Sequence, residues 1–191
     1  LLGELAYKTI IVNRYPEGYN YVSINHRESF REVTAHYLKH AGDNAQAFFV
    51  DIRYSGNFVT AERREGFMDA CEAAEKFYRV IPPGKDYNEL LKTLLKLKYR
   101  KNDPVIMIAP TATLTGAALK MAAERGLVHG KNFFFCDTDN THPLRDYGVN
   151  ITSILQDYQG MGEAAIEAVK KLKKGKLIQT FVPFQISNLI G

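Results

Sequence analysis

Apolar runs rich in β-branched and aromatic residues alternate with segments of helical period along almost the whole chain of 191 residues. This alternation predicts βαβ units. The expected strands cover residues 9–12, 21–24, 47–50, 77–81, 105–109, 133–135, 151–154 and a late edge segment near 181–184. The expected helices cover residues 29–40, 60–76, 87–97, 113–124 and 161–174. Gly42, Gly126 and Gly175 follow three of these helices as stop signals.

Several of the expected strands are apolar at consecutive positions, as strands covered by helices on both faces must be. With right-handed crossovers this pattern predicts an α/β fold with a three-layer, doubly wound and mostly parallel sheet. The strand at 9–12 is preceded only by residues that resemble the tail of a helix. We therefore expect residues 1–20 to be a remnant of a first subdomain. Residues 21–191 should form a C-terminal subdomain whose late segment returns toward the first.

Charge and cysteine content narrow the function classes. The net charge of +4 is only mildly basic, and the lysine cluster at residues 170–176 is typical of a solvated helix end, with Gly175 as its cap. This is a weak signal for nucleic-acid binding. No run of 18 apolar residues occurs, so we expect no transmembrane span. Cys71 and Cys136 form no CxxC pair, which favours two buried or half-buried thiols in a reducing, cytosolic compartment.

Several short runs occur in a characteristic order and spacing from residue 21 onward. They are residues 22–27 (VSINHR), 36–42 (HYLKHAG), 61–67 (AERREGF), 104–109 (PVIMIA), 116–119 (GAAL), 124–127 (ERGL), 139–140 (DN) and 154–162 (ILQDYQGMG). Together these runs resemble the effector-binding region of the LacI/GalR family of bacterial transcription regulators. The fold of that region is the type I periplasmic-binding-protein-like fold.

The resemblance implies a cytoplasmic regulator that senses a small, sugar-like effector and uses no cofactor. It also implies a homodimer, and DNA binding only through a helix-turn-helix segment expected ahead of the residues seen here. In the complete form two lobes would close around the effector and change the affinity for DNA. Such a switch works only if the effector binds one state better than the other.

Two charged residues match effector contacts of the family. Arg63 matches the position whose guanidinium usually binds hydroxyls or a carboxylate, and a planar fork of donors recognises paired oxygens with defined geometry. The structural alternative is a surface arginine. Asp139 matches the aspartate that follows an apolar strand, where a carboxylate can accept two sugar hydroxyls. Its structural alternative is a turn or helix-capping aspartate.

Four further residues complete the set of expected effector contacts. Tyr87 matches a position that often presents an aromatic face to the ligand ring, although a purely structural tyrosine is an equal alternative. Gln156 and Tyr158 match the strand that lies near the interdomain hinge in members of the family, where the glutamine side chain can face the cleft. Asn13 stands where the family often has a sugar-binding aspartate, so that one acceptor is kept and a donor is added.

The chain also departs from the family pattern after the strand at 105–109. The usual polar residue and aspartate are replaced by Pro110 and Thr111. Pro110 can offer only its carbonyl. Thr111 and Thr113 are suited to cap the helix that follows. We therefore expect the effector to be held differently from the sugar in the best-known members.

Two alternative functions remain open at this stage. Residues 133–141 (FFFCDTDNT) also resemble the strand and motif of haloacid-dehalogenase-type phosphohydrolases, with Asp137 as nucleophile, Asp139 as acid/base and Mg²⁺ as partner. The acids that follow, Asp146, Asp157, Glu163 and Glu167, are scattered, so we expect no enzyme. The other alternative is an extracytoplasmic sugar-binding protein of an ABC transporter, which shares the fold. The five histidines form no HExxH motif, and we expect no metal site.

Overall fold

The computed structural model describes residues 7–52, 57–100, 102–139, 150–173 and 175–190. Contacts divide the chain into two compact units, the first of Leu1–Asn25 and Gln156–Gln185 and the second of His26–Leu155 and Ile186–Gly191. This division differs from the boundary expected near residue 20. The strand around residue 21 belongs to the first unit because its hydrogen-bonding neighbours, on both sides, lie there.

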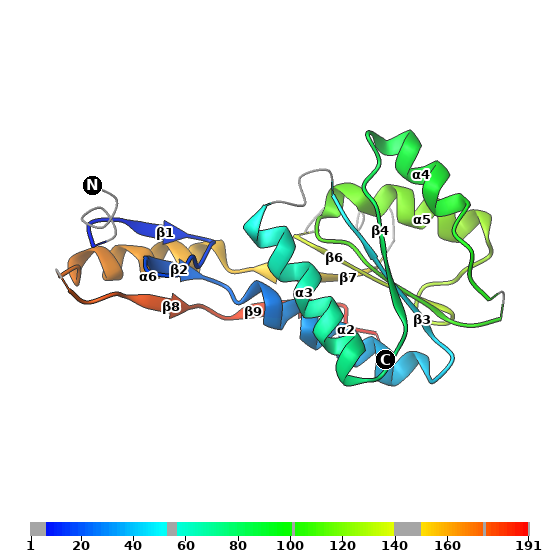
Figure 1. Ribbon diagram of the computed structural model, residues 1–191, viewed down its shortest axis with the longest axis horizontal. Coiled ribbons are helices and arrows are strands. Elements are labelled where there is room, and N and C mark those ends of the chain that lie inside the picture. The colour runs from blue at the N-terminus through cyan, green and yellow to red at the C-terminus, as the bar shows by residue number, and fades with distance from the viewer. Residues whose placement is uncertain (1–6, 53–56, 101, 140–149, 174, 191) are drawn as a thin grey trace. The chain divides into compact units, whose positions relative to one another are not determined.

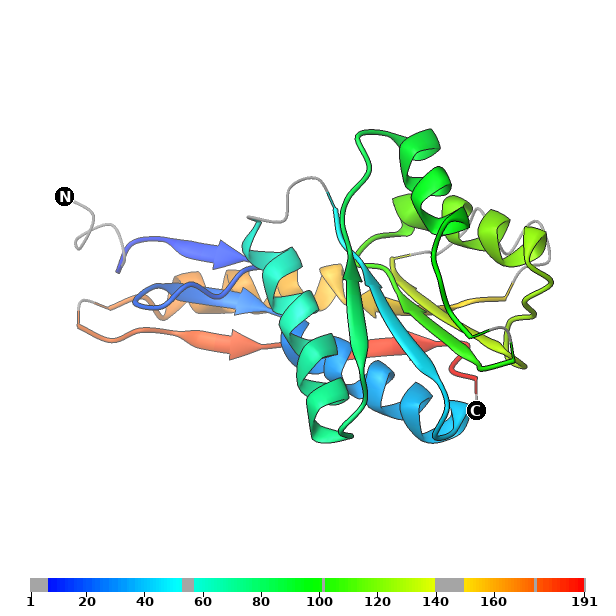
Figure 2. The same ribbon diagram turned by 45° about the vertical axis from the view of Figure 1, so that its right-hand side comes forward.

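Among its described residues, the first unit consists of a three-stranded parallel sheet and one helix. Its strands are β1 (Ile10–Val12), β2 (Asn20–Ser23) and β8 (Gln179–Phe181), in the order β1-β2-β8. Helix α6 (Tyr158–Lys170) lies along them (Figures 1 and 2). Met161 and Ala168 of the helix pack against Val22 and Ile24, which forms a small apolar core. The first and last parts of the chain are therefore joined in one unit.

The second unit contains a six-stranded sheet in the order β4-β3-β5-β6-β7-β9. The strands are β3 (Gln46–Val50), β4 (Tyr78–Ile81), β5 (Val105–Ile108), β6 (Phe133–Thr138), β7 (Thr152–Gln156) and β9 (Phe184–Ser187). The pairs from β4 to β7 are all parallel. The late edge segment expected near 181–184 is two strands, β8 and β9, separated by Val182 and Pro183.

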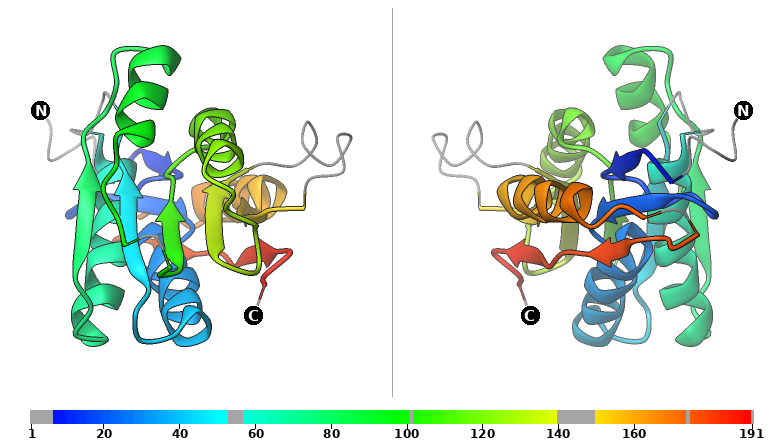
Figure 3. Two further views of the ribbon diagram at one scale, coloured as in Figure 1. Left: turned by 90° about the vertical axis from the view of Figure 1, so that its right-hand side faces the viewer. Right: turned by 90° about the vertical axis from the view of Figure 1, so that its left-hand side faces the viewer.

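Helices cover both faces of this sheet (Figure 3). Helices α2 (His26–Ala41) and α3 (Phe58–Ala73) lie on one face, and α4 (Tyr87–Leu95) and α5 (Thr115–Glu124) lie on the other. Phe48 of β3 joins the core formed with α4 and α5, whereas the neighbouring Phe49 contacts the rings of Phe30 and Phe67 on α2 and α3. Successive strand residues are thus buried on opposite faces, which explains the consecutive apolar positions.

The ends of the helices agree only in part with the sequence signals. Gly42 and Gly126 follow α2 and α5 with positive φ angles of 83° and 65°, as expected of stop signals. Gly175 was expected to cap the last helix, which is wrong: α6 ends at Lys170, and Gly175 lies in a turn closed by a bridge between Lys173 and Lys176. No helix in the described part of the chain is both long and apolar enough to cross a membrane.

Close packing of α2 against α3 depends on Gly66. A Cβ atom at this position would overlap the carbonyl oxygen of Arg27 and lie 2.9 Å from its carbonyl carbon. We expect Gly66→Ala to lower the free energy of unfolding by about 1–3 kcal/mol, because two backbones must separate to accommodate the methyl group. The control is Gly116→Ala, where the new Cβ would lie 3.6 Å from the Tyr87 ring, an ordinary contact. Urea unfolding followed by circular dichroism should show the loss for Gly66→Ala only.

Both cysteines are free and buried, in agreement with the sequence. Burial raises the pKa of Cys71 to about 12 and that of Cys136 well above its usual range. Since the thiolate is the reactive species, we expect neither thiol to react with Ellman's reagent at pH 8 in the native protein, and both to react in guanidinium chloride. Rapid release of thionitrobenzoate from Ellman's reagent by the native protein would contradict this burial.

Candidate functional site

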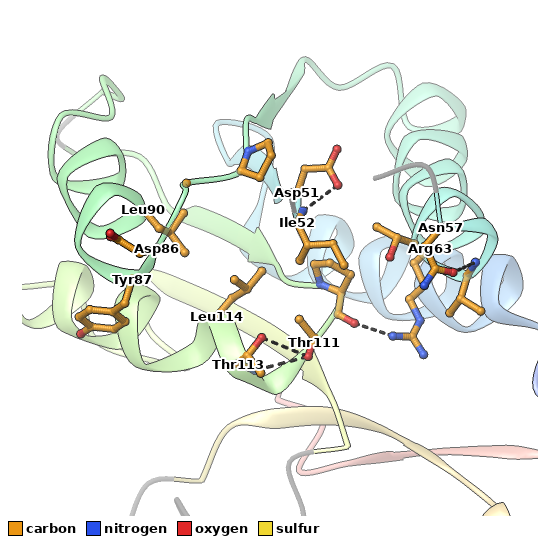
Figure 4. A pocket seen from close by; sticks show the side chains of 15 residues that line it. Asp51, Ile52, Asn57, Arg63, Asp86, Tyr87, Leu90, Thr111, Thr113 and Leu114 are labelled. Atoms are coloured by element: carbon orange, nitrogen blue, oxygen red, sulfur yellow. Dashed lines mark hydrogen bonds between the residues drawn. The ribbon is translucent and has the colours of Figure 1, made fainter. Parts of the chain in front are cut away.

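The strand order of the second unit identifies where a ligand is expected. The chain runs from β3 to β4 on one side and then to β5 on the other side of β3, so the order reverses between β3 and β5. In open α/β sheets ligands bind outside the carboxyl ends of the strands at such a switch point. A hollow of about 500 Å³ lies there (Figure 4).

We call this cavity the switch-point hollow. It is lined by Asp51, Ile52, Asn57, Val59, Thr60, Arg63, Pro83, Gly84, Asp86, Tyr87, Leu90, Pro110, Thr111, Thr113 and Leu114. These residues come from the loops after β3, β4 and β5 and from the starts of α3 and α4. Arg63 lies on one side of it, and Asp86 and Tyr87 lie on the other (Figure 4).

Arg63 is held in a fixed position at the hollow. It is only 8% exposed, and its Nη1 donates a hydrogen bond of 2.5 Å to the carbonyl oxygen of Pro110. Its Nη2 lies 3.5 Å from His26 Nδ1, and its guanidinium carbon lies 5.6 Å from the centroid of the Phe30 ring. The alternative of a surface arginine is therefore wrong. The carbonyl of Pro110, the one group that this residue can offer, serves to anchor the guanidinium.

Asp51 is a residue that the sequence interpretation missed. It follows β3 directly and is buried, with its Oδ2 3.0 Å from Arg64 Nη1. Its Oδ1 accepts a hydrogen bond of 2.8 Å from the amide of Ile52. A signal was present, since Asp51 is the first polar residue after the apolar strand at 47–50, at the edge where ligands bind. The ion pair joins Asp51 to Arg64 of α3, which is not among the residues that line the hollow.

The loop after β4 contributes an exposed aromatic face. Tyr87, the first residue of α4, is 47% exposed, and its hydroxyl lies 3.5 Å from the carbonyl oxygen of Gly116. Asp86 caps α4 by accepting a hydrogen bond of 2.9 Å from the amide of Glu89. A Cβ at Gly84 would lie 2.5 Å from the amide nitrogen of Leu90, so only glycine lets the loop pass so close to the helix.

The loop after β5 begins as a capped turn. Thr111 caps the 3₁₀ turn η1 (Ala112–Leu114) by accepting a hydrogen bond of 3.4 Å from the amide of Thr113. The helix expected at 113–124 is therefore η1 followed by α5. Thr111 has the capping role that the sequence predicts, and Thr113 lies inside the turn that it caps.

The two aspartates at the end of β6 have different surroundings. Asp137 is fully buried and accepts a hydrogen bond from the hydroxyl of Thr115. A carboxylate so enclosed cannot attack a phosphate ester, so the proposed nucleophile of the phosphohydrolase alternative is not accessible. Asp139 follows the strand with a φ of 59°, and its amide donates a hydrogen bond of 2.9 Å to Ile154. It does not line the switch-point hollow.

The remaining predicted contacts lie in the first unit. Asn13 follows β1 with a φ of 62°, and its amide donates a hydrogen bond of 2.9 Å to the carbonyl oxygen of Val22. Gln156 Nε2 donates a hydrogen bond of 2.7 Å to the hydroxyl of Tyr158, which is exposed at the start of α6. Of the six predicted residues, Arg63 and Tyr87 are the two that line the switch-point hollow.

Among the residues that the structure describes, no three or more His, Cys, Asp or Glu side chains are placed to hold one metal ion.

Three solved structures with a similar fold are transcriptional regulators. A LacI transcriptional regulator from a Rhodococcus species superimposes with a TM-score of 0.75 and 21% identity, over 100% of this chain and 73% of that one. The trehalose repressor from Escherichia coli gives 0.72 and 16%, over 97% and 71%. A LacI-family regulatory protein from Chloroflexus aggregans gives 0.74 and 19%, over 95% and 68%. The chain has the fold of LacI-family transcriptional regulators.

The LacI-like fold confirms the α/β, periplasmic-binding-protein-like architecture predicted from the sequence. The similar structures are regulators and not enzymes. No protein-family model matches the sequence, and no curated protein matches it. Because the sequence identities are 21% or lower, this similarity establishes the fold. The roles of individual residues follow from the geometry of the site.

The hydrogen bond from Thr115 to Asp137 supports the sheet edge beneath η1. We expect Thr115→Val to lower the free energy of unfolding by about 1.5–3 kcal/mol, because it removes a donor to a buried carboxylate. The same substitution at Thr113 is the control. Its exposed hydroxyl makes only a 3.4 Å contact with Thr111, and the change should stay within about 0.5 kcal/mol. Equal losses for both variants in urea unfolding would contradict a special role for Thr115.

Proposed function

We propose that this chain is the small-molecule-sensing portion of a LacI-like transcription regulator. The observation that carries the proposal is the anchored guanidinium of Arg63, at a hollow located where this fold is expected to bind ligands. In the whole regulator we propose a cytoplasmic homodimer that contacts DNA through a separate segment. The chain itself would carry no catalytic activity and no cofactor.

The side chains of the hollow suit a ligand with a ring and paired oxygens, such as a sugar or a related metabolite. Arg63 presents a rigid fork of donors to such oxygens, and Tyr87 offers an aromatic face to a ring. Asp139, Asn13, Gln156 and Tyr158 remain proposed contacts through the family resemblance alone. Effector binding would act on DNA affinity only to the extent that it distinguishes two states of the regulator.

A thermal-shift screen of sugars, sugar phosphates and nucleobases tests this proposal. A ligand at 100 times its dissociation constant adds about 2.7 kcal/mol to the stability of the native state, which is a measurable rise in melting temperature. We expect Arg63→Lys to weaken the best ligand about tenfold or more, because the ammonium keeps the charge and loses the planar fork.

The control for this experiment is Arg31→Lys. Arg31 is an exposed arginine of α2 that pairs with Glu28, away from the hollow. Ligand affinity measured by calorimetry should be unchanged in this variant. An unchanged affinity in Arg63→Lys, or an equal loss in both variants, would show that the ligand does not bind at the switch-point hollow.

A further inference from the structure

A second hollow lies at the opposite edge of the same sheet. Its volume is about 720 Å³, and it is located at the amino ends of β3, β4 and β5. We call it the amino-edge hollow. It is lined by Asp43, Asn44, Ala45, Gln46, Glu75, Lys76, Phe77, Arg79, Lys98, Tyr99, Arg100 and Asp103. It shares no residue with the switch-point hollow.

The cations of the amino-edge hollow are only partly neutralised. Lys76 pairs closely with Asp43, at 2.9 Å. Arg100 is largely exposed and approaches Asp103 only to 3.9 Å, a loose contact. Arg79 and Lys98 form no ion pair with any of the described residues. Two cations, Arg79 and Lys98, and one carboxylate, Glu75, therefore remain outside these pairs, so the side chains that line the hollow have a net positive charge.

Two contacts orient the guanidinium group of Arg79. Its guanidinium carbon lies 4.8 Å from the centroid of the Phe48 ring, and one Nη donates a hydrogen bond to the backbone carbonyl of Lys98. An arginine side chain has five donors in a rigid plane. The stacking and the single bond to a neutral carbonyl fix this plane and leave donors for a phosphate or a carboxylate.

A solvent-exposed aromatic ring lines the same hollow as these cations. Phe77 directly precedes β4 and is 80% exposed, the largest exposed fraction among the large apolar side chains described. An exposed ring next to cations suits a ligand that combines a flat ring with an anionic group. The ring of such a ligand stacks on phenylalanine while the anion meets the cations.

We propose that the amino-edge hollow binds a small anion in which a phosphate or carboxylate group is joined to a planar ring, as in a nucleoside monophosphate. Arg79 and Lys98 hold the anionic group, and Phe77 stacks on the ring. This site is separate from the proposed effector site, because it lies at the other edge of the sheet and uses none of its residues. Loss of either site leaves the other intact.

Titration of the isotope-labelled chain with adenosine monophosphate and with inorganic phosphate, followed by amide chemical shifts, tests the proposal. Both probes should shift amides at residues 76–80 and 97–100. Lys98→Gln should weaken both probes about threefold or more, since an exposed charge contact is removed. Phe77→Ala should weaken adenosine monophosphate about fivefold and leave inorganic phosphate unchanged, because only the former has a ring to stack.

The matched control is Lys120→Gln, which removes one exposed lysine from α5 outside both hollows. It should change neither affinity. Equal weakening by Lys120→Gln and Lys98→Gln would mean general attraction to a basic protein and would overturn the proposal. Shifts confined to the surroundings of Asp51 and Arg63, abolished by Arg63→Lys, would also overturn it, because the probe would then occupy the switch-point hollow. Absence of any shift overturns it equally.

Discussion

The second unit is organised by the need to bury a parallel sheet on both faces. Neighbouring positions of β5 such as Ile106 and Met107 point to opposite faces, and both are fully buried. Parallel pairing also requires a crossover after each strand, so helices are supplied to the two faces in turn. The carboxyl ends of the strands β3 to β7 then meet at one edge. The switch-point hollow is a consequence of this topology before any particular side chain is considered.

The contact between Arg63 and Pro110 shapes that edge. It joins the start of α3 to the loop after β5, with His26 of α2 beside it and Phe30 beneath it. A hydrogen bond from a charged donor is stronger than one between neutral groups, and in this buried position it is poorly screened by solvent. Replacement of a polar residue by proline therefore does not leave the site empty of interactions. A polar side chain at this position could contact a ligand directly. The carbonyl of Pro110 instead orients the side chain of Arg63.

The two edges of the sheet differ in charge. At the carboxyl edge the carboxylates of Asp51 and Asp86 are engaged by Arg64 and by the start of α4. At the amino edge Arg79 and Lys98 have no carboxylate partner among the described residues. The five residues of β3 that separate the edges span roughly 17 Å. At that distance two small ligands would bind without touching each other, and each edge can be studied alone.

The positions of the strands and helices were predictable because hydrophobic period is a local property of the sequence. Arg63 and Tyr87 were identified as matches to contact positions of a family that the chain resembles in the order and spacing of its short runs. Asp51 was also predictable, from the hydrophobic pattern, because it is the first polar residue after the apolar strand at 47–50.

Tertiary structure alone decided three other points. The anchoring of Arg63 joins residues 47 positions apart, and the sheet of the first unit joins β2 to β8, more than 150 positions away. The burial of Asp137 removed a catalytic interpretation that its motif allowed. Such outcomes depend on which distant surfaces pack together, and the local pattern of apolar and polar residues does not contain that information. The sequence by itself determined the elements and the fold class. Packing decided which polar groups line a cavity and which are buried in hydrogen bonds within the protein.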